Sequence, residues 1–107
     1  MTERDRNHAH DDPFDLHRFL EAQEGVYDRA LGELRSGRKR GHWMWFIFPQ
    51  IEGLGRSATT RYYAVKSAEE ARAYLHHPVL GPRLRDCARA LLALDTHAAR
   101  DVLGYPD

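Results

Sequence analysis

Residues 19–37, FLEAQEGVYDRALGELRSG, decide the fold, because they carry a long apolar stripe within a charged segment. The members of the stripe recur every three or four positions, which places their side chains on one face of an α-helix. Gly37 follows the last of them, as glycine commonly follows a helix C-terminus, and Asp15 is suited to cap the N-terminus. The pattern predicts one helix over about residues 15–36. Its stripe consists of Phe19, Gln23, Val26, Tyr27, Ala30, Leu31 and Leu34.

Two further helices are predicted downstream of residue 66. Ser67 and Glu70 have the spacing of a capping box, in which the serine oxygen accepts the Glu70 backbone N–H and the glutamate reaches back to the Ser67 N–H. This helix is expected over residues 68–76 and ends before Pro78, because a residue that precedes proline avoids helical angles. The next helix is expected over residues 80–95, with Pro82 in its first turn.

The end of the chain predicts a last short helical turn over residues 98–103, capped by Thr96 and stopped by Gly104. Cys87 lies on the apolar face of the helix predicted before it, so we interpret it as a packing residue rather than a nucleophile. His76 and His77 project from different faces of their helix, which favours a helix-terminal role over joint chelation of one ion.

Outside the aromatic segment of residues 42–50, extended structure is indicated at one place only, residues 59–65, TTRYYAV, which are rich in the β-branched and aromatic residues typical of strands. No internal repeat and no low-complexity tract interrupts the helical pattern. The predicted fold class is therefore mainly α, a small single-domain helical fold with an irregular aromatic-rich segment. Residues 1–12, MTERDRNHAHDD, are charged and are predicted to form a disordered leader to a domain spanning residues 13–107.

The composition narrows the classes of partner. The 107 residues include 16 basic and 16 acidic side chains, so no overall charge draws the chain toward nucleic acid or a membrane surface. The single cysteine, Cys87, excludes an intrachain disulfide. No apolar run reaches the roughly 18 residues that span a bilayer. We predict a cytoplasmic protein with no membrane partner, no metal site and no cofactor; the sequence does not specify an oligomeric state.

A dense aromatic segment, residues 42–50, HWMWFIFPQ, follows directly on the most basic run, RSGRKRG. Taken on periodicity alone, its apolar core is either a buried strand or a buried helical turn. Tryptophan and histidine carry N–H groups that need partners when buried, so they tend to lie where a core meets a wet surface. The adjacent cations also oppose the negative end of the preceding helix dipole, which is a purely structural role.

The functional interpretation of this junction is a site for a small anionic ligand, phosphate-bearing and nucleotide-like. Cations would meet the anion while a tryptophan stacks on a ring. His42 is the one candidate general acid or base, since an imidazole titrates near neutrality in water. No recognisable nucleophile arrangement surrounds it, so the sequence leaves open whether the protein is an enzyme. The predicted ligand-binding residues are Arg38, Lys39, Arg40, His42, Trp43, Gln50, Arg56 and Ser57.

The alternative hypothesis is a protein-interaction module without catalysis. Exposed Trp, Tyr and Arg dominate the hot spots of protein–protein interfaces, and Trp43, Arg61, Tyr62 and Tyr63 could form such a patch. A ligand site requires a concave hollow, whereas a partner surface requires an exposed apolar patch of several hundred Å². Nucleic-acid binding would use the same basic and aromatic residues, but the zero net charge disfavours it.

Several blocks of the chain together resemble the bacterial family known as domain of unknown function 1810. They are DLHRFLEAQ, ELRSGRKRGHWMWFIFPQIEGLGRS, RYYAV, EEARAYLHHPVLGPRL and LGYPD, and KRGHWMWFIFPQ is the most characteristic part. The resemblance implies a mainly α-helical fold, a helical or irregular aromatic segment, and no established activity. Some members carry the label calpastatin, which the absence of repeats and of a disordered composition does not support here. Members continue past the GYPD block, so a C-terminally truncated domain with an uncovered apolar face is expected.

Overall fold

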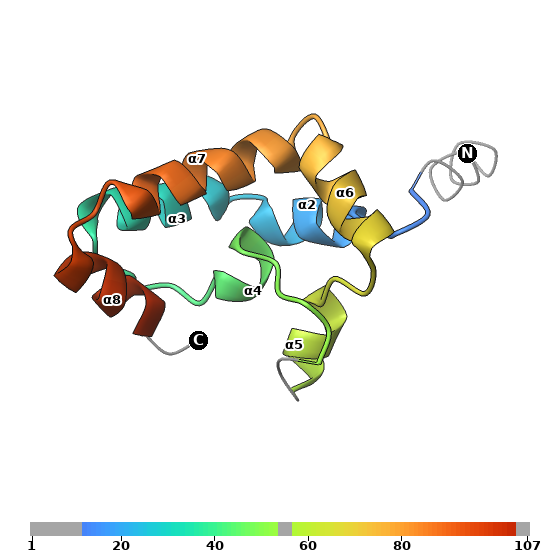
Figure 1. Ribbon diagram of the computed structural model, residues 1–107, viewed down its shortest axis with the longest axis horizontal. Helices are drawn as coiled ribbons and strands as arrows, with labels where there is room; N and C mark the ends of the chain where they lie inside the picture. The colour runs from blue at the N-terminus through green and yellow to red at the C-terminus, as the bar shows by residue number, and fades with distance from the viewer. Residues whose placement is uncertain (1–11, 54–56, 105–107) are drawn as a thin grey trace.

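The structure is a computed structural model, and it describes residues 12–53 and 57–104. Within these residues nearly all the regular secondary structure is helical, which confirms the predicted mainly α fold (Figure 1). The leader residues 1–11 lie outside the described part of the chain. The helices are α2 (His17–Gln23), α3 (Tyr27–Ser36), α4 (Met44–Ile47), α5 (Ala58–Tyr63), α6 (Ala68–His76), α7 (Leu80–Leu92) and α8 (Thr96–Gly104).

The longest helix, α7, runs alongside α3, while α6 packs at one end of it and α8 follows at the other (Figure 1). Helix α2 contacts the short α4, and α4 contacts α5. Two groups of buried side chains result. One, around Leu34, Trp43 and Cys87, lies between α3, α4, α7 and α8, and the other, around Phe19 and Tyr74, lies between α2, α6 and the start of α7.

The first predicted helix is two helices, so the prediction of one helix over residues 15–36 was wrong. Helix α2 ends at Gln23, where Glu24 takes an extended ψ of 124° and Gly25 a left-handed φ of 72°. Glycine adopts this φ without steric penalty, because it has no Cβ. The break lets α2 contact α4 while α3 packs along α7. The Gln23 amide donates a 2.7 Å hydrogen bond to the Phe46 carbonyl oxygen of α4.

The cap of α2 also differs from the prediction. Asp15 has a φ of 53° and its side chain does not cap the helix. Asp12 caps it instead, because its two carboxylate oxygens accept the backbone N–H groups of Leu16 at 2.7 Å and His17 at 3.0 Å. The residue type was predicted correctly and its position was not. Asp12, the last residue of the predicted leader, thus contacts the start of α2.

The aromatic segment forms a single helical turn, α4, as the family resemblance implied. The strand interpretation of residues 59–65 was wrong for most of their length. The Ser57 hydroxyl accepts the Thr60 backbone N–H at 3.0 Å and starts α5 there. Only the last two residues of the stretch leave the helix: Ala64 is extended, and Val65 forms an isolated parallel bridge with Ile51. A local cap has overridden the strand propensity of the threonines and tyrosines.

The predicted start of α6 is confirmed, since the Ser67 Oγ accepts the Glu70 backbone N–H at 3.0 Å. The second half of the capping box is not formed. Glu70 instead accepts the Lys66 backbone N–H at 3.0 Å and binds the guanidinium of Arg18. His77 has the predicted helix-terminal role, because its Nδ1 accepts the backbone N–H groups of Val79 and Leu80, at the start of α7.

The two helices predicted at the end of the chain are confirmed, but their first or last residues differ from the prediction. Helix α7 ends at Leu92 rather than at residue 95, and α8 begins at Thr96. The cap of α8 is Asp95 and not Thr96, since the Asp95 Oδ1 accepts the Ala98 backbone N–H at 2.8 Å. Cys87 is fully buried, as its place in the pattern predicted, and burial raises the pKa of its thiol to about 11. Such a thiol is a packing group at neutral pH.

In the described part of the chain no helix has the length and the apolar character required to cross a membrane.

Helix α7 approaches α6 closely at Gly81, in the first turn of α7. A Cβ added there would lie 2.2 Å from the carbonyl oxygen of Leu75 in α6. We expect Gly81→Ala to lower the free energy of unfolding by about 1–3 kcal/mol, because the backbone must move to admit the methyl group. Urea denaturation measures this change. The matched control is Gly32→Ala in α3, where nothing lies within 4 Å of the added Cβ, and helix propensity alone predicts a gain of about 0.5–1 kcal/mol. Equal effects of the two substitutions would contradict the close approach.

Candidate functional site

The loop between α3 and α4, residues 37–43, is organised around a carboxylate that the sequence analysis did not single out. The Oε1 atom of Glu33, on the last turns of α3, accepts the backbone N–H of Arg40 at 2.7 Å and that of Gly41 at 2.9 Å. The same oxygen accepts the indole Nε1–H of Trp43 at 2.9 Å. Three donors therefore converge on one anionic atom, an arrangement that stabilises negative charge strongly.

Burial by itself would raise the pKa of the Glu33 carboxyl. It is outweighed by the hydrogen bonds from Gly41, Arg40 and Trp43 together with the charge of Arg29, and the pKa lies below its ordinary value. Glu33 is consequently ionised at neutral pH. The anion that this basic, aromatic loop binds in the structure is thus a side chain of the protein itself.

Lys39 and Trp43, two of the predicted ligand-binding residues, are inside the protein. Lys39 is 4% exposed and Trp43 is 1% exposed. The Lys39 Nζ donates to the Gly41 carbonyl oxygen at 2.7 Å and lies 5.0 Å from the centre of the Trp43 ring. Burial lowers the pKa of Lys39, and the nearby Glu33 charge opposes that shift. In this conformation neither the ammonium group nor the indole face is open to a ligand.

The other predicted residues divide into two groups. Arg38, Arg40 and His42 are exposed on the loop itself. Gln50 and Ser57 flank the turn that leads into α5, where the Gln50 carbonyl oxygen accepts the Val65 backbone N–H at 2.7 Å and Ser57 caps the helix. Five of the predicted residues therefore lie together on the loop, and Gln50 and Ser57 lie elsewhere. The five are Arg38, Lys39, Arg40, His42 and Trp43. Arg56 lies outside the described residues.

The aromatic patch predicted for a protein partner also changes. Trp43 cannot contribute because it is buried. Tyr62 is 53% exposed and packs edge-on against the half-buried Tyr63, with ring centroids 4.8 Å apart. Arg61 is exposed beside them on α5. What remains is a small surface on α5, without the tryptophan.

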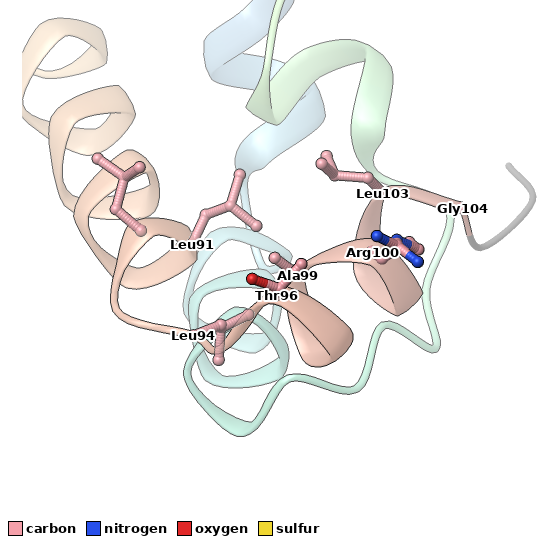
Figure 2. Close-up of a pocket in the computed structure, with 8 residues that line it drawn as sticks. Leu91, Leu94, Thr96, Ala99, Arg100, Leu103 and Gly104 are labelled. Carbon is pink, nitrogen blue, oxygen red and sulfur yellow. The ribbon is translucent and has the colours of Figure 1, made fainter.

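A larger apolar surface lies between the end of α7 and α8, and sequence reasoning placed no site there. It is an open groove of about 670 Å³, and Figure 2 shows Leu91 from α7 and Leu103 from α8 on its opposite sides. Two of its leucines are mostly in solvent, with Leu92 82% and Leu103 57% exposed. The residues that define its walls are Leu91, Leu92, Leu94, Ala99, Arg100 and Leu103.

The geometry of α8 explains why these side chains stay uncovered. Val102 is fully buried in the core group around Trp43 and anchors the helix. Ala99 and Leu103 are four positions apart and so share a neighbouring face, which turns toward the groove. The signal in the sequence was the pair Leu91–Leu92, because two adjacent leucines cannot both face the core that Cys87 faces.

Comparison with known proteins places the chain among uncharacterised relatives. Residues 13–107 match the model of a family described as "Protein of unknown function (DUF1810)". The crystal structure of the conserved hypothetical protein Rv1873 from Mycobacterium tuberculosis is similar, with 51% sequence identity and a TM-score of 0.84. The match covers 90% of this chain and 69% of that one. Among curated proteins, none matches the chain.

Proposed function

The chain belongs to the DUF1810 family of proteins of unknown function, and we propose that it is a non-catalytic binding protein that takes an amphipathic helix of a partner in the groove between α7 and α8. The observation that carries this proposal is the exposure of Leu92 and Leu103 beside a hollow of about 670 Å³. Large apolar side chains that gather in solvent at one place commonly mark a binding site, whereas singly scattered ones are normal on a protein surface.

The free energy gained by burying the leucines of the groove supports a helical occupant. Burying one leucine completely stabilises by about 1.5–3 kcal/mol, so two or three leucines of the groove together supply several kcal/mol. Part of that sum is offset by the loss of rotational and translational freedom on association. A groove between two helices accepts the side chains that a third helix presents at positions i, i+3, i+4 and i+7. A weak affinity, in the millimolar to high-micromolar range, is therefore the expected result.

The charge at the edge of the groove indicates which charge the partner helix should carry. Arg100 is the one charged residue among the described residues that line the groove. A partner helix with Leu on its apolar face and Glu at the edge would bury its leucines and meet this guanidinium. A lysine at the same edge would be repelled. The proposed occupant is therefore an acidic amphipathic helix.

The test uses a 14-residue helical peptide with Leu at positions i, i+3, i+4 and i+7 and Glu at the flanking positions, and a twin with Lys in place of Glu. Fluorescence anisotropy measures binding of each to the full chain. We expect the Glu peptide to bind at least tenfold more tightly than the Lys peptide, and Leu103→Ser to weaken it by at least tenfold. Leu75→Ser is the matched control, because Leu75 is also partly exposed, at 42%, but lies outside the groove.

Three outcomes would contradict this proposal. They are equal affinity for the two peptides, unchanged binding by Leu103→Ser, and self-association of the chain that Leu103→Ser abolishes. The last of these, measured by sedimentation equilibrium, would make a second copy of the chain the occupant of the groove. Loss of binding in Leu75→Ser as well would show an unspecific apolar contact.

We propose the binding of a small phosphate-bearing anion at the loop of residues 37–43 as a second candidate function. It is supported by three exposed side chains of suitable chemistry on one short segment, Arg38, Arg40 and His42. Because Trp43 is buried and Glu33 already uses its N–H group, the ligand would be held by charge rather than by stacking. If a reaction accompanies binding, His42 is the group that could transfer a proton.

The expected result for this candidate is binding of ATP that weakens as salt is added, as calorimetry and tryptophan emission would report. Arg38→Ala combined with Arg40→Ala should remove most of it and leave the unfolding curve unchanged, since exposed charges contribute at most about 1 kcal/mol to stability. The matched control is Arg61→Ala combined with Arg72→Ala, which removes two positive charges from exposed positions outside the loop. This control should bind ATP as the wild type does. Equal loss in both double variants, or no binding by the wild type, would rule out this candidate.

A further inference from the structure

A second cavity, distinct from both the groove and the loop of residues 37–43, lies between the start of α2 and the end of α6. Its volume is about 360 Å³. Binding pockets for drug-sized molecules span roughly 300–1,000 Å³, so this one suits a single small ring system. The residues that give it its chemistry are Asp12, Phe14, Leu16, His17, Leu20 and His77.

The imidazole of His77 presents a hydrogen-bond donor whose position is fixed by the backbone. Its Nδ1 accepts the N–H groups of Val79 at 3.1 Å and Leu80 at 3.2 Å. That nitrogen therefore carries the lone pair, and in the neutral ring the proton is on Nε2. Because His77 lines the cavity, it offers an N–H donor held in one tautomer.

The carboxylate of Asp12 provides the complementary acceptor. Its oxygens each accept one backbone N–H, from Leu16 and His17. A carboxylate has about four acceptor positions, so about half of them remain for a further donor. The same two bonds cap α2, which holds the carboxylate in place. His17, also on this rim, has its Nε2 3.8 Å from the Glu21 carboxylate.

We infer that this cavity binds a small planar molecule with an apolar ring and a neutral, amide-like edge. The carbonyl oxygen of such an edge would accept the His77 N–H, and its amide N–H would bind Asp12. The ring would pack between Phe14 and Leu20, whose side chains provide the apolar wall. An anionic head group would be repelled by Asp12, and an ammonium group would leave the His77 donor without an acceptor. The cavity thus selects a neutral donor–acceptor pair over either charge.

The probes are benzamide, benzoate and benzylamine, which share the ring and differ in the head group. Chemical-shift titration of the Leu16, Leu20 and Ala73 methyl groups in the full chain measures binding at this cavity. We expect benzamide to shift these methyls in a saturable way and to bind at least about threefold more tightly than benzoate or benzylamine. His77→Asn keeps an acceptor for the Val79 and Leu80 N–H groups but lacks Nε2, and it should weaken benzamide binding about tenfold.

His76→Asn is the matched control, because His76 is the neighbouring exposed histidine and is not among the residues that line the cavity. It should bind benzamide as the wild type does. Ala73→Leu, which fills the cavity from α6, should abolish the shifts of the Leu20 methyls. The inference is overturned if benzamide leaves the three residues unshifted, if the three probes bind equally, or if His77→Asn binds benzamide as tightly as His76→Asn.

Discussion

The guanidinium of Arg18 is the interaction on which the arrangement of the helices depends. It is 5% exposed, and its five N–H groups all have acceptors. Two bonds go to the carbonyl oxygens of Phe14 and Asp15 before α2. The others go to the carbonyl oxygens of Tyr62 and Ala64 and to the Glu70 carboxylate, which lie 44, 46 and 52 positions further along the chain. A buried charge is tolerated only when it is paired and fully hydrogen-bonded, so this one group ties α2, the end of α5 and α6 together.

The same rule shapes the rest of the interior. Gln23 joins α2 to α4 and α6, through the Phe46 carbonyl oxygen and the Tyr74 hydroxyl, and Glu33 joins α3 to the loop before α4. In the described part of the chain no buried side-chain nitrogen or oxygen lacks a partner. The buried polar side chains of these residues thus form hydrogen bonds within the protein itself. The surfaces for which binding is proposed are the leucines of α7 and α8, the exposed side chains of the loop of residues 37–43 and the rim of the cavity between α2 and α6.

Features that act within a few residues could be predicted from the sequence, and features that depend on distant partners could not. Ser67 and Pro78 act locally, and the helix between them was predicted correctly. The apolar stripe continues through Gly25, so nothing in the periodicity marked the break that lets Gln23 reach α4. The predicted ligand-binding residues include most of the loop of residues 37–43 but not Glu33, the residue that organises this loop. Glu33 binds groups seven to ten positions away, beyond the spacing at which neighbours on a helix can be recognised. The groove formed by α7 and α8 depends on the angle between two helices, which no single segment encodes.

Urea unfolding of Arg18→Lys tests the dependence on Arg18 most directly. Lysine keeps the positive charge opposite Glu70 but carries three donors on one nitrogen instead of five on a planar fork. If the hydrogen bonds to four backbone carbonyl oxygens tie the helices together, Arg18→Lys should lower the free energy of unfolding by about 2 kcal/mol or more. The double variant Arg18→Lys with Glu70→Gln should not recover it. Unfolding of Arg18→Lys at the urea concentration of the wild type would contradict the account, because charge alone would then suffice.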